Sequence, residues 1–273
     1  MLVQVLMDNN TKSELLCEWG LAVYIEYKDK KIVLDGGTSG AFVRNAEMLG
    51  IDLNAVDFGV LSHAHYDHAD GLCAFFEKND HAPLYLREGS GENCFKKEGE
   101  GYKYIGIREG FLEEYAERLC YVDGDFSPTE GVYLLPHKVP GMEELGKKAK
   151  MYREEEGVWR PDCFAHEQSL VFDTKQGLFI FNSCSHGGAD NIIREVGETF
   201  PGKPIFALFG GLHLHESKEE DIYALAERIR QTGIQKIYTG HCTGDVAMEI
   251  LKKELGDVVE SIYSGFEIKG IEE

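Results

Sequence analysis

The feature that most constrains the fold of this chain is the stretch 58–72, in which a short apolar run ends in three histidines and an aspartate within six residues. The apolar run 58–61 is typical of a fully buried strand. His63 and His65 follow where such a strand leaves its sheet, and alternate side chains of an extended backbone project to the same side. Two imidazoles can therefore converge on one cation at this strand end.

Two further candidate ligands, Asp67 and His68, follow as the chain turns. Adjacent residues face different ways, so this pair can serve a second cation near the first. Imidazole and carboxylate together suit zinc, manganese or iron rather than calcium. The alternative is a polar loop without metal. However, burial of four such groups without partners would cost free energy, and packing alone gives no reason for it. We therefore expect His63, His65, Asp67 and His68 to be metal ligands.

This arrangement resembles that of a known family. The pattern His-x-His-x-Asp-His after a hydrophobic strand is the signature of the metallo-beta-lactamase fold, and the four residues from His63 to His68 match it one by one. The resemblance implies an α/β protein with the four-layer αββα sandwich of that fold, formed by residues 1–273 as a single domain. It also implies a dinuclear centre with two divalent metal ions. Zinc is the first candidate, and manganese, iron or magnesium are the alternatives.

Length and charge limit the class of protein. The 273 residues, of which 43% are hydrophobic, are enough for one large α/β domain with its own core. The formal charge of −20, from 28 basic and 48 acidic residues, opposes broad contact with a phosphate backbone, so we expect no nucleic-acid partner. We expect a small-molecule substrate instead. An anionic substrate is compatible with the charge because bound metal changes the local sign.

The cysteines indicate the cellular compartment. Seven of them are scattered along the chain without a Cys-x-x-Cys pair, and no signal peptide or long apolar span is recognised. This pattern predicts free thiols in a reducing cytoplasm and no membrane partner. The oligomeric state stays open.

Hydrophobic periodicity and turn signals predict strands that alternate with helices along most of the chain. The predicted strands are 2–7, 19–27, 31–35, 58–61, 83–87, 120–122, 132–135, 168–173, 178–182, 204–209, 236–239, 258–263 and 266–269. The predicted helices are 41–49, 71–78, 109–119, 190–199, 216–232 and 245–255.

Two segments, 88–119 and 136–162, interrupt this alternation with mixed and polar sequence. Insertions of this kind in an α/β chain usually cover or shape the substrate pocket. The alternative for any one of their residues is a solvated loop without contact to substrate. We therefore predict none of them to be catalytic.

Three predicted strands of the second half end in a histidine, namely His186, His213 and His241. Strand-end loops are where open α/β sheets place their sites, so one pocket can collect all three. In the resembled fold the centre needs one more histidine for the first metal and a late one for the second. His241, in Gly-His-Cys-Thr-Gly, suits the late position. For the other we prefer His186, at a strand end, to His166, which precedes a strand.

The sequence allows two roles for each of several residues near these motifs. Asp35, in Asp-Gly-Gly, either braces the metal loop, as the resembled fold implies, or only forms a turn. Cys184 stands where many relatives carry a bridging carboxylate, and it is either a soft metal ligand or a buried free thiol. His213 either contacts a substrate phosphate or carries a proton, or it supports a ligand. We expect His81 and His137 at the surface.

Later motifs narrow the resemblance. Cys-Ser-His, Gly-Gly-x-His and Gly-His-Cys-Thr-Gly, beside an early Glu-Trp-Gly-Leu and Leu-Asp-Gly-Gly, are similar to motifs of one subfamily of metal-dependent hydrolase-like proteins. That subfamily is named for 7,8-dihydropterin-6-methyl-4-(beta-D-ribofuranosyl)aminobenzene-5'-phosphate synthase. Ser183 and Gly187 stand where glycine and proline are expected, and Trp19 where histidine is common. These departures leave the predicted metal ligands intact.

The resemblance implies an enzyme, and two reactions fit its centre. A synthase would join a dihydropterin-methyl diphosphate to an arylamine ribose phosphate with loss of diphosphate, with Asp67 and His213 as the candidate catalytic residues. A hydrolase would direct a metal-activated water at a phosphoester, thioester or lactone. The same ligand set serves both reactions. A non-catalytic metal- or ligand-binding module is the third class, and it predicts binding without turnover.

Overall fold

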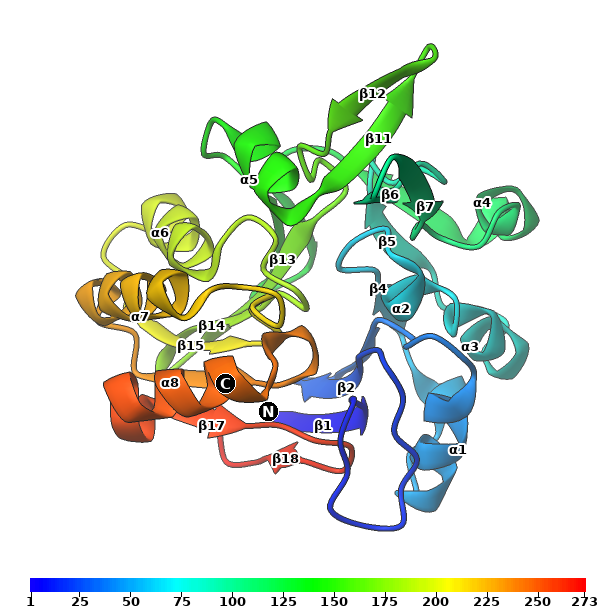
Figure 1. Ribbon diagram of the computed structural model, residues 1–273. Helices are drawn as coiled ribbons and strands as arrows, with labels where there is room; N and C mark the ends of the chain where they lie inside the picture. The colour runs from blue at the N-terminus through cyan, green and yellow to red at the C-terminus, as the bar shows by residue number, and fades with distance from the viewer.

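The computed structural model describes residues 1–273, and two seven-stranded β-sheets lie face to face in it with helices outside them (Figure 1). In the order in which its strands pair, the first sheet contains β18 (Glu267–Ile268), β1 (Leu2–Met7), β2 (Ala22–Tyr27), β3 (Lys30–Leu34), β4 (Phe58–Val60), β5 (Leu84–Arg87) and β8 (Leu119–Val122). The second sheet contains β17 (Val259–Ser261), β16 (Lys236–Thr239), β15 (Ile205–Phe209), β14 (Gly177–Phe181), β13 (Gln168–Thr174), β10 (Val132–Pro136) and β9 (Phe126–Thr129). Both sheets contain parallel and antiparallel pairs.

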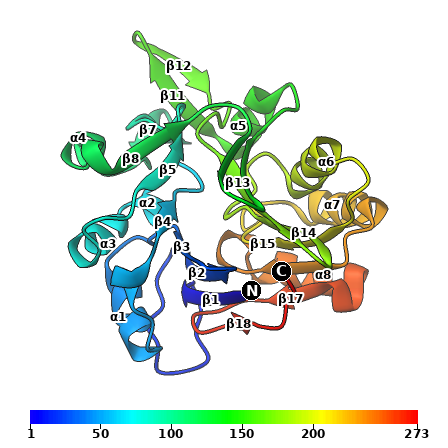
Figure 2. The ribbon, with the colours of Figure 1, turned by 180° about the vertical axis from the view of Figure 1, so that it is seen from behind.

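The main helices cover the outer faces of the two sheets (Figures 1 and 2). Helices α1 (Ala41–Met48) and α3 (Leu72–Lys78) share an apolar cluster with the first sheet. Helices α6 (Ala189–Thr199), α7 (Glu219–Thr232) and α8 (Asp245–Leu255) share another with the second sheet. The layers therefore follow the order helix, sheet, sheet, helix, and the predicted αββα sandwich is confirmed.

Strand β14 shows how the sequence builds these layers. Phe179 and Phe181 point into the apolar cluster between the two sheets, and Leu178 and Ile180 point into the cluster beneath the helices. All four side chains are fully buried, because each face of the strand is covered. A strand that is buried on both faces has a continuous apolar sequence, and that pattern allowed this strand to be predicted.

The two predicted insertions meet in a third, smaller sheet. Its strand order is β12-β11-β6-β7, and a short helix precedes β11. The elements are β6 (Phe95–Glu98), β7 (Gly101–Tyr104), α5 (Met142–Ala149), β11 (Met151–Glu155) and β12 (Val158–Pro161). Pairing of Lys96 with Met151 joins the two insertions, and the β11–β12 hairpin projects from the body of the molecule (Figure 1).

None of these four small strands was predicted, because their sequences are mixed and polar and Met151 is the one buried residue among them. The residues of β12 are exposed or half-buried, and those of β6 and β7 are likewise. Their stability comes instead from aromatic contact across the sheet, where the rings of Tyr102 and Trp159 stack with centroids 3.7 Å apart.

The predicted helix 109–119 is wrong. The segment contains only the single turn α4 (Phe111–Glu114) and a 3-10 turn, and β8 begins at its last residue. Phe111 and Tyr115 have helical spacing, but both rings lie against Phe76, and the helix ends at Tyr115. The remaining predicted strands and helices are confirmed with ends that differ by a few residues, and β9 was not predicted.

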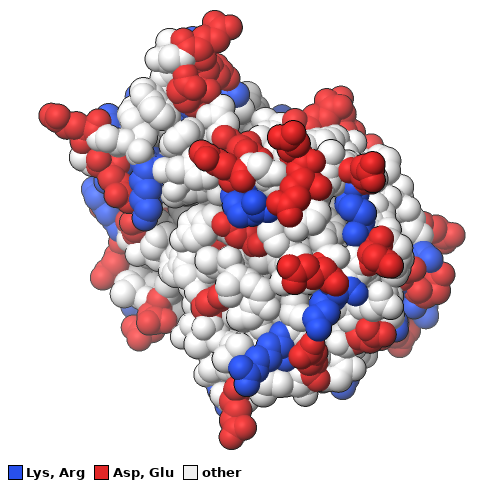
Figure 3. All heavy atoms as spheres, turned by 90° about the vertical axis from the view of Figure 1, so that its right-hand side faces the viewer, with Lys and Arg blue, Asp and Glu red and all other residues white.

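The surface is rich in acidic side chains. On the face in Figure 3, acidic residues outnumber basic ones, and the basic residues stand in small separate groups beside them. That face offers no continuous basic surface to a phosphate backbone. No helix combines the length and the apolar composition that crossing a bilayer requires.

Candidate metal centre

The predicted ligands of the first half lie where β4 ends. His63 and His65 are in the loop after the strand, and Asp67 and His68 are on the one-turn helix α2 (Tyr66–Ala69). Because β4 pairs in parallel with β3 and β5, it lies inside its sheet, and its carboxyl end lies at the edge where open α/β sheets place their sites.

The predicted ligands of the second half come from three consecutive strand ends of the other sheet. His186 follows β14, His213 follows β15 and His241 follows β16. These three strands are parallel neighbours, so their ends meet at one edge. The structure therefore brings residues of both sheets together, as the sequence predicted for a single pocket.

A first group consists of His63, His65 and His186, whose ring nitrogens lie within 4.8 Å of one another. All three side chains are buried, and Nε2 of His63, Nε2 of His65 and both ring nitrogens of His186 have no hydrogen-bond partner. Burial and then the neighbouring imidazoles lower the pKa of His63 and His186 well below the ordinary value. Burial and then His166 lower the pKa of His65 to about 3. Neutral imidazoles with unused nitrogens in a buried cluster fit a divalent cation.

A second group lies beside the first. His68 Nε2 is 3.1 Å from His241 Nε2 and 3.7 Å from Asp67 Oδ2, and His241 Nε2 is 3.4 Å from the same oxygen. Burial acts to raise the pKa of Asp67, but His68 and His241 outweigh it and hold the pKa below its ordinary value, so the carboxylate is ionised. Burial acts to lower the pKa of His241, but Cys242 and Asp67 raise it to about 9. A group that attracts a proton so strongly also attracts a metal cation.

Cys184 lies between the two groups. Its Sγ is 3.2 Å from His68 Nε2 and 3.4 Å from Cys242 Sγ, and both thiols are buried. It also lies within 4.8 Å of ring nitrogens of His63 and His68 together. The residue is therefore buried, as one interpretation of the sequence required, and its sulfur is also within reach of both groups.

Asp35 braces the segment that carries the candidate ligands after β4. Its backbone has a left-handed φ of 59°, and its carboxylate accepts hydrogen bonds from Ser62 N at 2.7 Å, Ser62 Oγ at 2.7 Å and His68 Nδ1 at 2.8 Å. Because the carboxylate has no donor, His68 carries its proton on Nδ1 and presents the lone pair of Nε2 to the second group. The bracing interpretation of Asp35 is confirmed.

Two residues that hold His241 in position by hydrogen bonds were not predicted from the sequence. Asp8 accepts from His241 N at 2.9 Å, and Asn9 Oδ1 lies 3.0 Å from His241 Nδ1. Both residues directly follow β1, in a segment that was predicted only as a polar loop. The strand-end rule that located the histidines would have marked them too.

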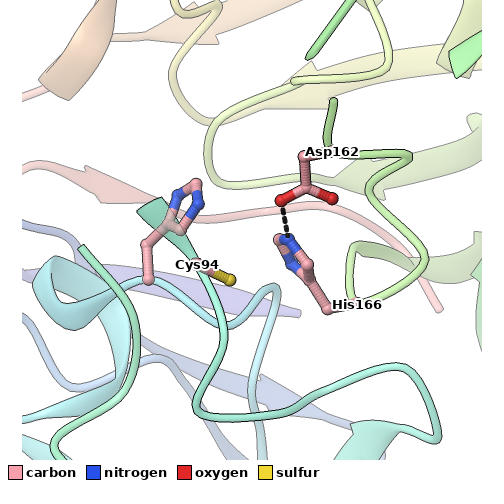
Figure 4. A group of neighbouring side chains, drawn as sticks. Cys94, Asp162 and His166 are labelled. Carbon is pink, nitrogen blue, oxygen red and sulfur yellow. Dashed lines mark hydrogen bonds and ion pairs between the residues drawn. The ribbon is translucent and has the colours of Figure 1, made fainter. Parts of the chain in front are cut away.

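His166 is hydrogen-bonded at both ring nitrogens. Nδ1 accepts from Ala64 N at 3.1 Å, so the proton is on Nε2, which donates to Asp162 at 3.1 Å. Figure 4 shows Asp162 and His166 facing one another, with the sulfur of Cys94 beside them. With both nitrogens engaged, His166 holds the loop that carries His63 rather than offering a lone pair to a cation. Asp162 and Cys94 come from the two insertions and were not predicted here.

The prediction that His137 lies at the surface is wrong, whereas His81 is exposed as predicted. The His137 ring is buried between two carboxylates: Nε2 bonds to Glu167, and Nδ1 lies 3.1 Å from Glu195 Oε2. Burial acts to lower the pKa of His137, but the bonds to Glu167 and Glu195 raise it to about 9. Glu167 also accepts from the backbone N–H of His186 at 2.9 Å, so this buried group supports a candidate ligand. The partners come from distant elements, which left no local signal.

His213 stands at the edge of the centre. Its backbone has a left-handed φ of 48°, and its N–H donates to Cys242 Sγ at 3.2 Å. The ring lies 4.4 Å from that of His186, centroid to centroid, and its buried Nδ1 has no partner. His213 and His186 both line a pocket of about 920 Å³. The His215 ring lies next to that of His213, with its centroid 5.1 Å from that of His213 and 5.2 Å from that of Trp19.

Comparison with known proteins finds a domain of a known family in the chain. Residues 20–146 match the model of the metallo-beta-lactamase superfamily. In sequence, the chain is 26% identical over 264 residues to a 7,8-dihydropterin-6-methyl-4-(beta-D-ribofuranosyl)-aminobenzene-5'-phosphate synthase of Methanocaldococcus jannaschii, with 92% of this chain and 89% of the relative covered. An uncharacterized protein of the same organism is 24% identical, with 92% and 94% covered.

Solved structures agree with the sequence comparison. A metal-dependent hydrolase of the beta-lactamase superfamily has a TM-score of 0.83 and 29% identity, with 100% of both chains covered. A diphosphatase at 16% identity has a TM-score of 0.57, with 98% of this chain and 97% of the other covered, and it supports the fold alone. Residues 20–146 thus form a metallo-beta-lactamase domain, and the chain as a whole has the fold of a metal-dependent hydrolase of that superfamily.

Proposed function

We propose that this enzyme couples a dihydropterin-methyl diphosphate to an arylamine ribose phosphate, with release of diphosphate. The proposal draws on the similarity to the synthase of Methanocaldococcus jannaschii, which extends over 92% of the chain. The observation that carries it is the set of buried ring nitrogens without partners in His63, His65 and His186, beside a pocket of about 920 Å³. Such a pocket has the size of a small-molecule site.

The two groups of side chains are the proposed metal ligands. His63, His65 and His186 would hold the first cation. Asp67, His68 and His241 would hold the second, with Cys184 within reach of both. Zinc suits this set of imidazole, carboxylate and thiol groups. When bound, two divalent cations supply positive charge that stabilises the negative charge on departing diphosphate oxygens.

Two side chains have proposed roles in the reaction itself. Coupling forms a bond between the pterin methyl carbon and the arylamine nitrogen, breaks the carbon–oxygen bond to diphosphate and releases a proton from the amine. His213 would accept that proton, and the proposal is supported by its Nδ1, which has no partner, and by its position in the pocket lining. Asp67 keeps its negative charge among the surrounding imidazoles, so it orients the second group rather than donating a proton.

Hydrolysis is the second candidate function. The metal-dependent hydrolase of the beta-lactamase superfamily with 29% identity favours it, since that similarity covers both chains completely. In hydrolysis the same residues would orient a water molecule at a phosphoester, thioester or lactone, and His213 would donate a proton to the leaving group. The ligand groups are common to both reactions, so substrate assays have to separate them.

The test is a mass-spectrometric assay of the metal-loaded protein with both substrates. We expect the coupled product and diphosphate in equal amounts, and we expect both to disappear in a His63→Ala variant. His81→Ala is the matched control, because it removes an exposed histidine far from the centre. Metal-dependent release of diphosphate without coupled product would favour hydrolysis, and absence of any reaction would refute the proposed synthase.

A further inference from the structure

The pocket of about 920 Å³ next to the candidate metal centre has more basic than acidic side chains, whereas the whole molecule has a negative net charge. It is lined by seven basic and four acidic side chains, in a chain with a formal charge of −20. Three of the acidic side chains are neutralised by basic residues of the same wall. These pairs are Lys96 with Glu216 at 2.8 Å, Lys148 with Asp221 at 3.1 Å, and Arg228 with Asp190 at 2.6 Å. Two of the other basic residues also have carboxylate partners, since Arg194 lies 3.9 Å from Glu198 and Lys218 lies 3.5 Å from Glu220. Lys97 and Lys150 therefore carry the unpaired positive charge of the pocket, against one unpaired acidic side chain, Glu98.

These two lysines supply the unpaired charge. Lys97 is on β6, and Lys150 follows α5, so each belongs to one of the two insertions. The N–H of Lys97 donates to the carbonyl of Lys150 at 2.8 Å, so the backbones of the two residues lie side by side at the pocket wall. The Lys97 ammonium lies 5.9 Å from the centre of the Tyr102 ring, and neither ammonium group pairs with a carboxylate. Cations without counter-ions attract an anionic ligand that enters the pocket.

A second wall carries unused hydrogen-bond donors. Helix α6 starts at Ala189 after the N-cap Gly188, which provides no side-chain cap. The first backbone bond of the helix runs from Ile192 N to Gly188 O, so the N–H groups of the first turn have no partner in the chain. Such a helix start attracts anions. Its one acidic side chain, Asp190, is neutralised by Arg228.

An independent observation points to a ligand at the same place. Ser185 lines the pocket just before α6 and is only 3% exposed, yet its Oγ has no hydrogen-bond partner. A buried hydroxyl without a partner is uncommon and needs an explanation. A phosphate oxygen in the pocket would accept this O–H and the backbone N–H groups of the α6 start together.

We propose that this pocket is a phosphate subsite, with Ser185 and the start of α6 on one wall and Lys97 and Lys150 on the other. It would hold a phosphate monoester of the substrate away from the reacting atoms and so orient the rest of the molecule toward His213. The inference rests on the proposed function for the identity of the phosphorylated substrate. The subsite itself rests only on the pocket.

Calorimetric titration of the metal-loaded protein with ribose 5-phosphate tests the subsite, with ribose as the uncharged reference. We expect the double variant Lys97→Ala/Lys150→Ala to bind ribose 5-phosphate about tenfold more weakly, and Ser185→Ala a few fold more weakly, because charge-assisted bonds to phosphate are lost. The matched control is Lys103→Ala/Lys147→Ala, which removes the same charge from β7 and α5 at exposed positions outside the pocket. We expect the affinity of that control to stay within about twofold of the wild type.

The outcomes separate the two proposals. Equal affinities of the pocket variant and the control variant would overturn the subsite, as would a wild type that does not distinguish ribose 5-phosphate from ribose. Lysine-dependent binding without coupling activity would sustain the subsite and refute the proposed synthase. Coupling activity with an unchanged KM for the arylamine phosphate in the pocket variant would sustain the synthase and overturn the subsite.

Discussion

Replacement of Asp35 by asparagine should weaken metal binding without unfolding the protein. The carboxylate accepts from Ser62 N, Ser62 Oγ and His68 Nδ1 at 2.7, 2.7 and 2.8 Å. An asparagine that keeps its oxygen toward Ser62 N turns its NH₂ toward His68. His68 must then accept at Nδ1 and carry its proton on Nε2, so it loses the lone pair that faces His241.

The size of the effect follows from this exchange of donor and acceptor. Loss of such a supporting bond to a metal-binding histidine typically lowers metal affinity about 10- to 100-fold, which corresponds to about 1.4 to 2.7 kcal/mol. Asparagine is the suitable substitution because the left-handed φ of 59° at Asp35 is one that asparagine adopts readily. The fold should therefore survive, which a circular dichroism spectrum would check.

The measurement is competition for zinc between the protein and a chelator of known affinity. Asp52→Asn is the matched control, because Asp52 is exposed, also accepts a backbone N–H at 3.0 Å, and loses the same charge far from the centre. We expect weaker zinc binding only in Asp35→Asn. If Asp35→Asn binds zinc as tightly as the control while His68→Ala does not, the reasoning about the proton on His68 is refuted.

Three further predictions concern stability. Chelation of bound metal should lower the melting temperature, and zinc at 100 times its dissociation constant should restore about 2.7 kcal/mol; a calorimetric scan that zinc does not change would contradict this. The folded pKa of His137, about 9, lies above the unfolded value of 6.5, so its contribution to stability is complete below about pH 6.5 and is lost as the pH rises through about 9. The difference in melting temperature between wild type and His137→Gln should therefore be largest below about pH 6.5 and shrink as the pH rises, and a difference that does not change with pH would contradict this. Gly71→Ala should cost about 3 kcal/mol or more in urea unfolding, since its Cβ would lie 1.9 Å from the carbonyl oxygen of Gly36, whereas Gly197→Ala meets no atom within 4 Å and should not destabilise.

The half of the candidate site that lies close together in sequence could be predicted, and the rest only in part. His63, His65, Asp67 and His68 follow one buried strand, so local spacing was enough to group them. His186 required a choice between two histidines. Strand-end position favoured it, and the structure supports that choice because its ring nitrogens are free, whereas both nitrogens of the alternative are bonded.

The contacts of the supporting residues could not be predicted because their partners are distant in sequence. Asp8 and His241 are 233 positions apart, and His137 and Glu195 are 58 apart. A buried carboxylate near a ligand has the same local sequence as one in a surface turn, so only the three-dimensional contact reveals its role. The small sheet of the insertions could not be predicted for the same reason. Lys96 pairs with Met151, which is distant in sequence, and neither segment has the pattern of a strand.

The distribution of the site over both sheets links metal binding to folding. In the first group, His63 follows a strand of the first sheet and His186 follows a strand of the second. In the second group, Asp67 lies on α2 after a strand of the first sheet, and His241 follows a strand of the second. Neither sheet alone therefore assembles either group. The buried imidazoles leave their ring nitrogens unsatisfied when the two sheets pack, which costs free energy that bound cations offset. The aromatic core between the sheets thus stabilises an arrangement that the unsatisfied ring nitrogens oppose, and we expect bound metal to remove that opposition.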